Sequence, residues 1–377
     1  MEFRSQILSL STLILLASSA MSQIVLQPID QECKVGSQAT FFVQTDGGTY
    51  QYQWQRNDGN WPGWMNIAGA NSDTYTTPML AVSDDGVCYR CRVNDSSSRE
   101  MSLIACTFIG LPNATYYVDS TNGNDANDGL TQATAWQSIA KVNAKKFSPR
   151  DRILFKRGET WTTNTTLTIS GTTSTIATAG NRIVVDAYGV GAKPIIQSAG
   201  AGVYNIRNAS GTNYLRFSNL DLRGASTSCL EIGSGINVIS HNIDAETSGN
   251  QAFQHTDTCV SKLINCTSTG CIDDGISGHT GTTITDIGGY HHGNSQNIQT
   301  IAGVTLKLFG TRLIGGSLDS LNATESVQGY GCWFGMNAGS GKGPVVKSGS
   351  TFAACVIDMR FTSGNANVAT SLSSTLT

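Results

Sequence analysis

The chain of 377 residues is poor in charge and in proline. Only 14% of its residues are Asp, Glu, Lys or Arg, the formal net charge is -3, and there are 7 prolines. A nucleic-acid surface needs clustered basic residues and a charge-driven disordered chain needs a high net charge, so both classes are excluded. A helical bundle would normally carry Glu and Lys on its exposed faces. The 41 glycines instead indicate a β-rich protein with many turns.

After the N-terminus, the chain has no apolar run long enough to span a membrane. The N-terminus itself combines Arg4, an apolar run from Ile7 to Ala17 and small residues up to Ala20. This order is typical of a secretory signal peptide, which we place at residues 1–23. A membrane anchor is the alternative, but the run is shorter than the roughly 20 residues that an anchor needs. We therefore predict a secreted, extracellular or cell-surface protein.

The chain also lacks the paired CxxC motifs of a structural zinc site, because Cys88 and Cys91 form the only such motif. Its ten cysteines fit an oxidising compartment and fall into two groups. The first group is Cys33, Cys88, Cys91 and Cys106, and the second is Cys229, Cys259, Cys266, Cys271, Cys332 and Cys355. The long gap between the groups predicts two separately disulfide-bonded domains, although the sequence leaves the pairing open.

Residues 24–110 carry the pattern of a small β-sandwich. Trp54 lies on a central β-like run, and Asp85-Gly-Val-Cys-Tyr89-Arg-Cys91 follows with D-x-x-x-Y-x-C spacing. The segment resembles the immunoglobulin-like modules of secreted bacterial proteins, in which the Trp packs on the core. Phe replaces the expected first cysteine on the strand at 39–43. Cys33 or Cys106 would then pair with Cys88 or Cys91, or the core lacks the usual bridge. Such a module is expected to be a spacer or a binding domain.

The rest of the chain contains a repeat of about 22 residues. Four segments align so that Leu220, Ile243, Cys266 and Ile287 coincide, at intervals of 23, 23 and 21 residues. The residues before them are Asn219, Asn242, Asn265 and Asp286. The period is too short for a propeller blade and suits one coil of a parallel β-helix. Asn tolerates the left-handed backbone of a turn, and stacked Asn side chains can hydrogen-bond from coil to coil.

The same alignment predicts a second parallel sheet after the next turn. Alternation along its strands points Leu230, Phe253, Ile276 and Ile298 inward. The neighbouring residues Glu231, Gln254, Ser277 and Gln299 then form an outward polar row.

Residues 115–161 have the features of an N-terminal cap. A first strand is followed by a Gly/Asn/Asp-rich turn, a short amphipathic helix at 135–144 and a strand that ends in Gly158-Glu-Thr-Trp161. Together with the repeat, this order resembles secreted right-handed β-helix proteins of the pectate-lyase-like superfamily. The resemblance covers residues 115 to about 315 and implies a right-handed parallel β-helix over residues 111–377. A calcium loop at Asp119–Asp128 is one interpretation, and an Asx-rich turn is the favoured one.

The candidate chemistry gathers between His241 and His292, which enclose all five histidines. The segment Asp273-Asp274-Gly275-Ile276-Ser277-Gly278-His279 adds a pair of carboxylates. The parity of His255 points it inward, and His241 lies beside the Asn column, so both are expected to be structural. The candidate catalytic residues are Asp273, Asp274, His279 and His292. The candidate substrate-binding residues are Glu231, Gln254, Ser277, His291 and Gln299.

The resemblance implies a polysaccharide bound in a groove on this sheet. We expect a lyase or a C5-epimerase that acts on a uronic-acid polysaccharide, without an organic cofactor. Calcium held by Asp273, Asp274 and Glu231 would neutralise the sugar carboxylate, and His279 or His292 would remove the C5 proton. Inverting hydrolysis by Asp273 and Asp274 is an alternative, although a G-H pair falls too early after them and no R-I-K motif follows. A non-catalytic adhesin or virion-spike-like glycan-binding protein is the alternative from another class.

Overall fold

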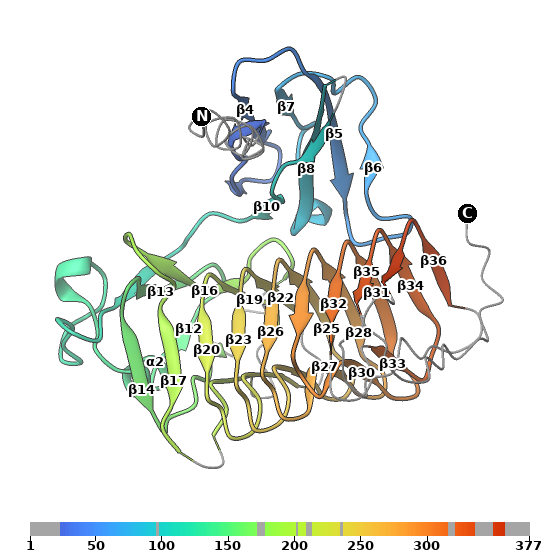
Figure 1. Cartoon of the computed structure of the whole chain (residues 1–377). Helices are drawn as coiled ribbons and strands as arrows, with labels where there is room; N and C mark the ends of the chain where they lie inside the picture. The colour runs from blue at the N-terminus through green and yellow to red at the C-terminus, as the bar shows by residue number, and fades with distance from the viewer. Residues whose placement is uncertain are drawn as a thin grey trace, which may run out of the picture.

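The computed structural model describes residues 23–95, 98–171, 178–200, 203–208, 213–233, 237–315, 321–335 and 350–358. A parallel β-solenoid makes up most of this part of the chain, and a smaller β domain precedes it (Figure 1). Helix is limited there to α2 (Ile139–Asn143), η2 (Val82–Asp84) and η3 (Gln132–Thr134). The predicted all-β class with a parallel solenoid is confirmed. The predicted signal peptide lies outside the described residues, except for its last residue.

Three parallel sheets run along the solenoid, and each coil between Ile183 and Ala323 contributes one strand to each sheet in turn. Sheet 1 consists of β11 (Thr115–Val118), β13 (Arg152–Lys156), β16 (Ile183–Tyr188), β19 (Leu215–Ser218), β22 (Asn237–His241), β25 (Val260–Ile264), β28 (Thr283–Ile287), β31 (Thr305–Phe309), β34 (Val327–Tyr330) and β36 (Thr351–Ala353). Sheet 2 consists of β14 (Thr160–Thr163), β17 (Ile195–Ser198), β20 (Asp221–Arg223), β23 (Asp244–Glu246), β26 (Thr267–Thr269), β29 (Tyr290–His292), β32 (Arg312–Ile314), β35 (Trp333–Gly335) and β37 (Val356–Asp358). Sheet 3 consists of β18 (Ile206–Asn208), β21 (Leu230–Ile232), β24 (Phe253–His255), β27 (Asp274–Gly278), β30 (Gln296–Thr300) and β33 (Leu321–Ala323).

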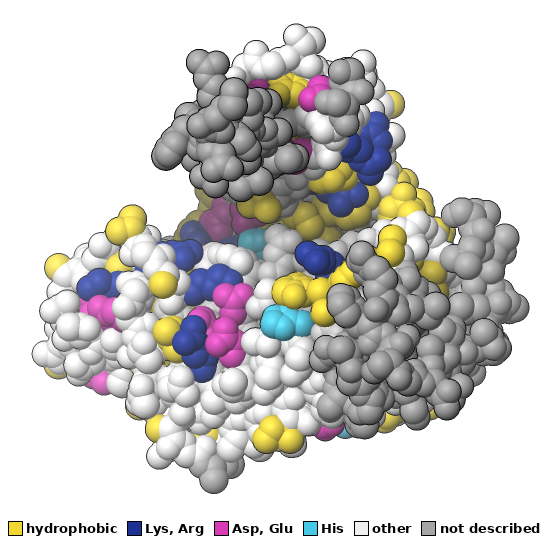
Figure 2. Space-filling model, in the orientation of Figure 1, with side chains coloured by type: hydrophobic (Ala, Val, Ile, Leu, Met, Phe, Trp, Pro, Cys, Tyr) yellow, Lys and Arg dark blue, Asp and Glu magenta, His cyan; other side chains and the backbone are white. Residues whose placement is uncertain are grey.

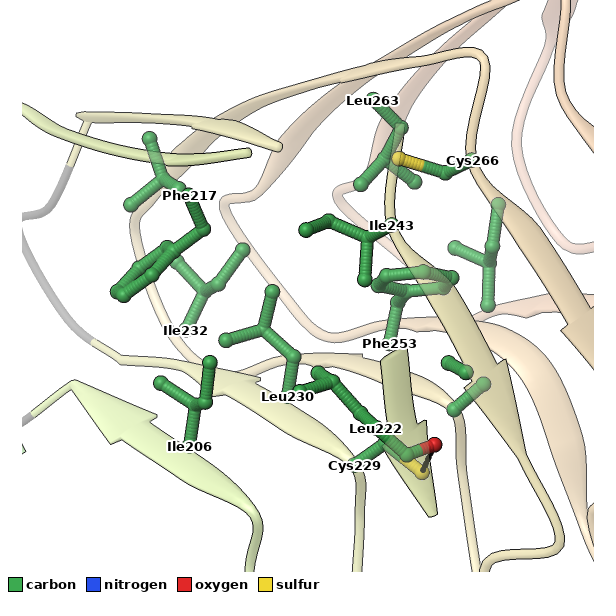
Figure 3. Close-up of a cluster of buried hydrophobic side chains, with 14 of the residues drawn as sticks. Ile206, Phe217, Leu222, Cys229, Leu230, Ile232, Ile243, Phe253, Leu263 and Cys266 are labelled. Atoms are coloured by element: carbon green, nitrogen blue, oxygen red, sulfur yellow. Dashed lines mark hydrogen bonds between the residues drawn. The ribbon is translucent and has the colours of Figure 1, made fainter. Parts of the chain in front are cut away.

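The rows predicted for sheet 3 are present. Leu230, Phe253, Ile276 and Ile298 pair in register and are fully buried. Glu231, Gln254, Ser277 and Gln299 form the adjacent row. Side chains from all three sheets meet in the interior, among them Phe217, Leu222 and Phe253 (Figure 3). Near the start of the solenoid, β12 (Lys146–Phe147) pairs with β15 (Ser170–Gly171).

The turn between sheets 1 and 2 has the left-handed backbone that the Asn column predicted. Asn219, Asn242 and Asn265 have φ angles of 56°, 54° and 51°, and Asn242 Nδ2 donates to Asn219 Oδ1 at 2.6 Å. The fourth member is Gly288, with φ 70°, and not Asp286. The aligned interval of 21 residues was wrong because Ile264 pairs with Ile287. Glycine adopts positive φ readily, so the turn keeps its left-handed backbone at Gly288 although the column of Asn side chains ends at Asn265.

The predicted disulfide bonding of two domains is wrong for the solenoid. One disulfide joins Cys88 to Cys106 in the N-terminal domain. The six cysteines of the second group are free thiols, and five of them are buried. Cys229, Cys266 and Cys332 lie in the solenoid core, where their Sγ atoms contact backbone carbonyls. A free thiol behaves there as a small apolar side chain.

The N-terminal domain is built mainly from antiparallel strand pairs. Its strands are β1 (Ile24–Leu26), β2 (Gln31–Cys33), β3 (Thr40–Phe42), β4 (Gln44–Thr45), β5 (Gln51–Asn57), β6 (Met65–Asn66), β7 (Thr74–Thr76), β8 (Val87–Asn94), β9 (Arg99–Met101) and β10 (Ala105–Ile109). Phe41, Trp54 and Tyr89 are buried in its core, where Phe41 stacks on Tyr89 at 4.7 Å. Trp54 pairs across the strands with the free thiol Cys91, so the usual core bridge is missing.

The N-terminal domain packs on the outer face of sheet 1 (Figure 1). The contact is an apolar cluster of Trp64, Cys88, Cys106 and Phe108 against Ile239, Ile264, Ile287 and Phe309. Arg182 Nε also bonds the Asp85 carboxylate at 2.6 Å, with both side chains buried. The N-terminal domain therefore covers part of the outer face of sheet 1.

Candidate functional site

The Asp273–Asp274 pair enters sheet 3 at its corner with sheet 2. Asp274 pairs with Gln296 at the start of β27, and Asp273 lies in the turn just before it. Gly275 faces inward, since a Cβ atom there would lie 2.4 Å from Ser268 Oγ. The chain therefore turns the Asp274 side chain toward the outer side of the sheet, where Ser277 also lies.

Asp274 is a buried carboxyl with a strongly altered acidity. It has no exposed surface, and neither of its oxygens has a hydrogen bond of ordinary geometry within the described residues. Burial, and then the charge of Asp273, raise its pKa to about 7, although Ser277 and Gln251 lie close enough to lower it in part. Asp274 can therefore hold a proton near neutral pH, as a general acid must.

Gln251 connects the two acids to the neighbouring coils. Its Nε2 donates to Asp273 Oδ2 at 2.8 Å, and its Oε1 lies 3.1 Å from the hydroxyl of Ser228. The same hydroxyl lies 2.9 Å from Gln254 Oε1. The Gln251 side chain also lowers the pKa of Asp274, so its amide lies close to both acids. The contacts with Ser228 hold the amide in this position. We call Ser228, Gln251, Gln254, Asp273 and Asp274 the acid cluster.

Two of the predicted binding residues lie farther along the outward row from Ser277. Glu231 is two coils from Ser277, which corresponds to about 10 Å. Its carboxylate pairs with Arg207 Nε at 2.5 Å. Gln299 lies one coil beyond Ser277. Among the described residues, one set of three potential ligand atoms lies close together, in Asp30, Cys106 and His241, but the Cys106 sulfur is engaged in the disulfide with Cys88. Asp273, Asp274 and Glu231 are thus not brought together as calcium ligands.

The two histidines proposed as bases are separated from Asp274. His279 follows the end of β27, five residues after Asp274, which corresponds to about 16 Å along an extended strand. His292 lies on sheet 2 and stacks on Tyr290, with ring centroids 4.4 Å apart. Burial, and then His291, lower the pKa of His292. Strand length and the corner between sheets place both histidines away from the acid cluster.

Two other histidines are parts of the core. The expectation that His291 binds substrate is corrected, because its ring points inward and is fully buried. Its Nδ1 lies 2.8 Å from Ser268 Oγ and its Nε2 lies 3.6 Å from Asp286 Oδ2. His255 is also fully buried, and its Nδ1 lies 3.0 Å from the Ser277 carbonyl oxygen. Burial lowers the pKa of His255 to about 4, so the ring is neutral at physiological pH.

The sequence pattern did not single out Ser228 and Gln251, although its spacing contained the signal. Leu230, Phe253 and Ile276 pair in register, so the residues two positions before them, Ser228, Gln251 and Asp274, also form a row. Extending the predicted row backward by two residues would have grouped Ser228 and Gln251 with Asp274, although not with Asp273.

The outer face of sheet 2 carries more charge, but its charges are paired. Arg223 bonds Asp221 through Nε at 2.8 Å and lies 3.5 Å from Glu246. Lys193 bonds Asp244 at 2.8 Å. Figure 2 shows acidic and basic side chains side by side on this face. Next to them Arg312 lies between the rings of Tyr290 and Trp333, 5.3 and 5.4 Å from their centroids. We therefore regard the acid cluster, with its unpaired Asp274, as the stronger candidate for catalysis.

The turn at 119–128 uses its carboxylates internally. Asp119 bonds Lys156 Nζ at 2.7 Å, and Asp125 accepts from Ser138 Oγ at 2.6 Å. Asp128 accepts from Thr134 Oγ1 at 2.7 Å. Asp119 Oδ1 also accepts from the backbone N–H groups of Thr121 and Asn122, which fits the favoured interpretation of an Asx-rich turn, whereas calcium binding to this protein stays a prediction.

No family model matches the sequence. Over 93 residues the chain is 38% identical to a lacto-N-biosidase of Bifidobacterium longum subsp. longum. The matched segment covers 23% of this chain and 5% of that protein. The chain thus matches about a twentieth of the length of this curated relative. Two structures of the GH136 lacto-N-biosidase from Eubacterium ramulus were also found. The selenomethionine derivative has 16% identity and a TM-score of 0.36, with 65% of this chain and 56% of that chain covered. The native protein has 13% identity and a TM-score of 0.27, with 67% of each chain covered.

The sequence similarity corrects one prediction. A polysaccharide lyase or C5-epimerase was expected, but the relative of similar sequence is a lacto-N-biosidase, a hydrolase.

Within the described residues, no helix is long and apolar enough to cross a membrane.

Proposed function

We propose that this protein is a secreted glycoside hydrolase and that the acid cluster on sheet 3 is its catalytic site. One observation carries the proposal: Asp274, whose pKa is raised to about 7, lies next to Asp273, which accepts a hydrogen bond from Gln251. Glycosidases need one carboxyl that is protonated and another that is ionised. The burial of Asp274 and its raised pKa suit it to be the protonated carboxyl of such a pair.

In this mechanism Asp274 donates its proton to the glycosidic oxygen as the bond to the leaving sugar breaks. Asp273, oriented by Gln251, acts as the base that activates water or as the nucleophile. Gln254 and Ser277 lie in the outward row beside the pair and would hydrogen-bond sugar hydroxyls. Glu231 and Gln299 extend this row by one coil on each side and would contact neighbouring sugars.

The substrate class follows from the relative of similar sequence, whose name suggests glycans that contain lacto-N-biose. We further propose that the solenoid is right-handed and that the N-terminal domain is of the immunoglobulin type. The buried Trp54 on a central strand supports the second point.

A glycan-binding protein without hydrolysis is the second candidate function. It is favoured by the complete burial of Asp274, whose proton reaches a sugar only after the side chains around it move. The outward row would then bind a glycan chain along the solenoid without cleaving it.

The test is the release of sugar from lacto-N-tetraose, with alginate and pectin as further substrates, each with and without added calcium. We expect hydrolysis of the neutral glycan, and a loss of at least 100-fold in Asp273→Asn and Asp274→Asn. Asp257→Asn is the matched control, because Asp257 is exposed in a turn with φ 54° and Asn suits that backbone. Unchanged turnover in Asp274→Asn would refute the assignment, and glycan binding without any product would favour the second candidate.

A further inference from the structure

Two cysteines of the solenoid lie side by side on neighbouring coils. Cys332 follows β34 and Cys355 follows β36, both in the turn between sheets 1 and 2. The backbone pairs in register on both sides of them. Gly331 N donates to the Ala353 carbonyl oxygen at 2.9 Å, and Val356 N donates to the Cys332 carbonyl oxygen at 2.8 Å. Both cysteines are free thiols, and we call them the thiol pair.

The spacing of the thiol pair suits a disulfide bond. In-register residues on neighbouring coils have Cα atoms about 4.8 Å apart, within the range of about 4.4–6.8 Å found for bonded cysteines. Cys332 N also donates to Cys355 Sγ at 3.3 Å. Each Sγ atom contacts the carbonyl oxygen two residues earlier, at 3.6 Å for Cys332 and 3.4 Å for Cys355, so the side chains point the same way. A bond between the two sulfurs therefore needs side-chain rotation without a rearrangement of the coils.

The other four cysteines of the solenoid, all of which are described, have no such neighbour. Cys266 stands in the same turn, but it lies three coils before Cys332, which corresponds to about 14 Å. The residues beside the remaining three on the following coil are Ala252 for Cys229, Thr282 for Cys259 and Asn294 for Cys271. The thiol pair is thus the one place in the solenoid where two cysteines occupy in-register positions of adjacent coils.

The two thiols differ in access and in acidity. Cys332 is buried in the solenoid core, and burial raises its pKa. Cys355 is half-buried at the margin of the core, and a hydrogen bond from the Cys332 side chain lowers its pKa. The thiolate is the reactive form of cysteine, so an accessible thiol with a lowered pKa attacks first. Cys355 is therefore suited to attack an oxidant, and Cys332 is placed to complete the bond.

We propose that the thiol pair is an oxidation site, at which a small disulfide such as glutathione disulfide links the last two described coils. The Cys355 thiolate attacks one sulfur of the oxidant and expels a thiolate, which leaves a mixed disulfide. The Cys332 thiol then loses its proton and attacks Cys355 Sγ, which releases the second thiolate of the oxidant. Two protein thiols are oxidised to one disulfide, and the oxidant is reduced to two thiols. This chemistry is independent of the acid cluster.

The test is incubation of the full chain in reduced and in oxidised glutathione buffers, followed by alkylation of free thiols in denaturant and peptide mass mapping. We expect a peptide that links Cys332 to Cys355 in the oxidised buffer, and alkylation of both in the reduced buffer. Cys332→Ser should trap glutathione on Cys355, whereas Cys355→Ser should leave Cys332 without glutathione because it is buried. Cys266→Ser is the matched control from the same turn and should leave the link unchanged.

The link closes a loop between residues 23 positions apart, which restricts the unfolded chain. Oxidation should therefore raise the urea midpoint more in the natural chain than in Cys355→Ser, which keeps the Cys88–Cys106 bond. Circular dichroism checks that each variant is folded. Alkylation of both thiols in the oxidised buffer, a glutathione adduct on Cys355 of the natural chain in place of the link, or a link to another cysteine would overturn the proposal.

Discussion

Gln251 donates a hydrogen bond of 2.8 Å to the carboxylate of Asp273, from the neighbouring coil of the solenoid. The contact is possible because parallel coils repeat at about 4.8 Å, within reach of a glutamine side chain. It gives Asp273 a fixed orientation beside Asp274, a second acid that is fully buried.

Loss of the Gln251 amide should therefore impair catalysis more than folding. Gln251→Leu keeps the volume but removes the donor to Asp273, so we expect kcat for glycan hydrolysis to fall at least 10-fold with a smaller change in KM. Gln328→Leu, on the exposed row of β34, is the control and should leave kcat unchanged. An equal fall in both variants would point to a general effect on the solenoid.

The raised pKa of Asp274 predicts a specific pH dependence of stability. Its folded pKa of about 7 exceeds the ordinary value of 3.8, so its contribution to stability is fully present below pH 4 and is lost as the pH rises through 7. The loss amounts to at most about 4 kcal/mol. Asp274→Asn should be more stable than the natural chain at pH 8, by urea denaturation. Equal stability at pH 8 would show that the carboxyl is not desolvated as described.

The lowered pKa of His255 predicts the opposite slope in an overlapping range. Its folded pKa of about 4 lies below 6.5, so its contribution is present above pH 6.5 and is lost as the pH falls through 4. The loss amounts to at most about 3 kcal/mol. The two slopes partly cancel in the natural chain, and Asp274→Asn should therefore expose a steeper acid-side loss. Urea midpoints of both proteins between pH 4 and 7 measure this loss of stability. The same pH profile in Asp274→Asn and in the natural chain would refute the opposing contributions of Asp274 and His255.

The contact between the domains predicts a large cost for removing Arg182. Arg182→Met leaves the Asp85 carboxylate buried without its partner, which should destabilise the protein by about 3–5 kcal/mol. The double variant Arg182→Met/Asp85→Leu removes both charges and should recover a substantial part of this loss. Differential scanning calorimetry gives the comparison, and no recovery would show that the loss comes from packing.

The predicted rows of sheet 3 were correct because a solenoid has a simple geometric rule. Residues one coil apart lie side by side, so the spacing from Phe253 to Ile276 is enough to pair them. The rule weakened where a turn changed its residue type, as at Gly288, where the backbone angle was kept without the Asn.

The site was harder to predict than the rows. His279 and His292 follow Asp274 closely in sequence, yet the length of β27 and the corner between sheets carry them away from it. The cysteine pattern was also misleading. A buried thiol such as Cys266 fills a core position as an apolar side chain does, without a disulfide partner.

The sequence by itself determined the all-β class, the parallel solenoid and the rows that hold Ile276 and Ser277, because these depend on a period that is visible along the chain. Only the tertiary structure decided which groups share an environment. The burial that raises the pKa of Asp274, the bridge from Gln251 and the covering of sheet 1 by the N-terminal domain all depend on distances between residues of different coils or domains. Acidity and access are set by those neighbours and by the water they exclude.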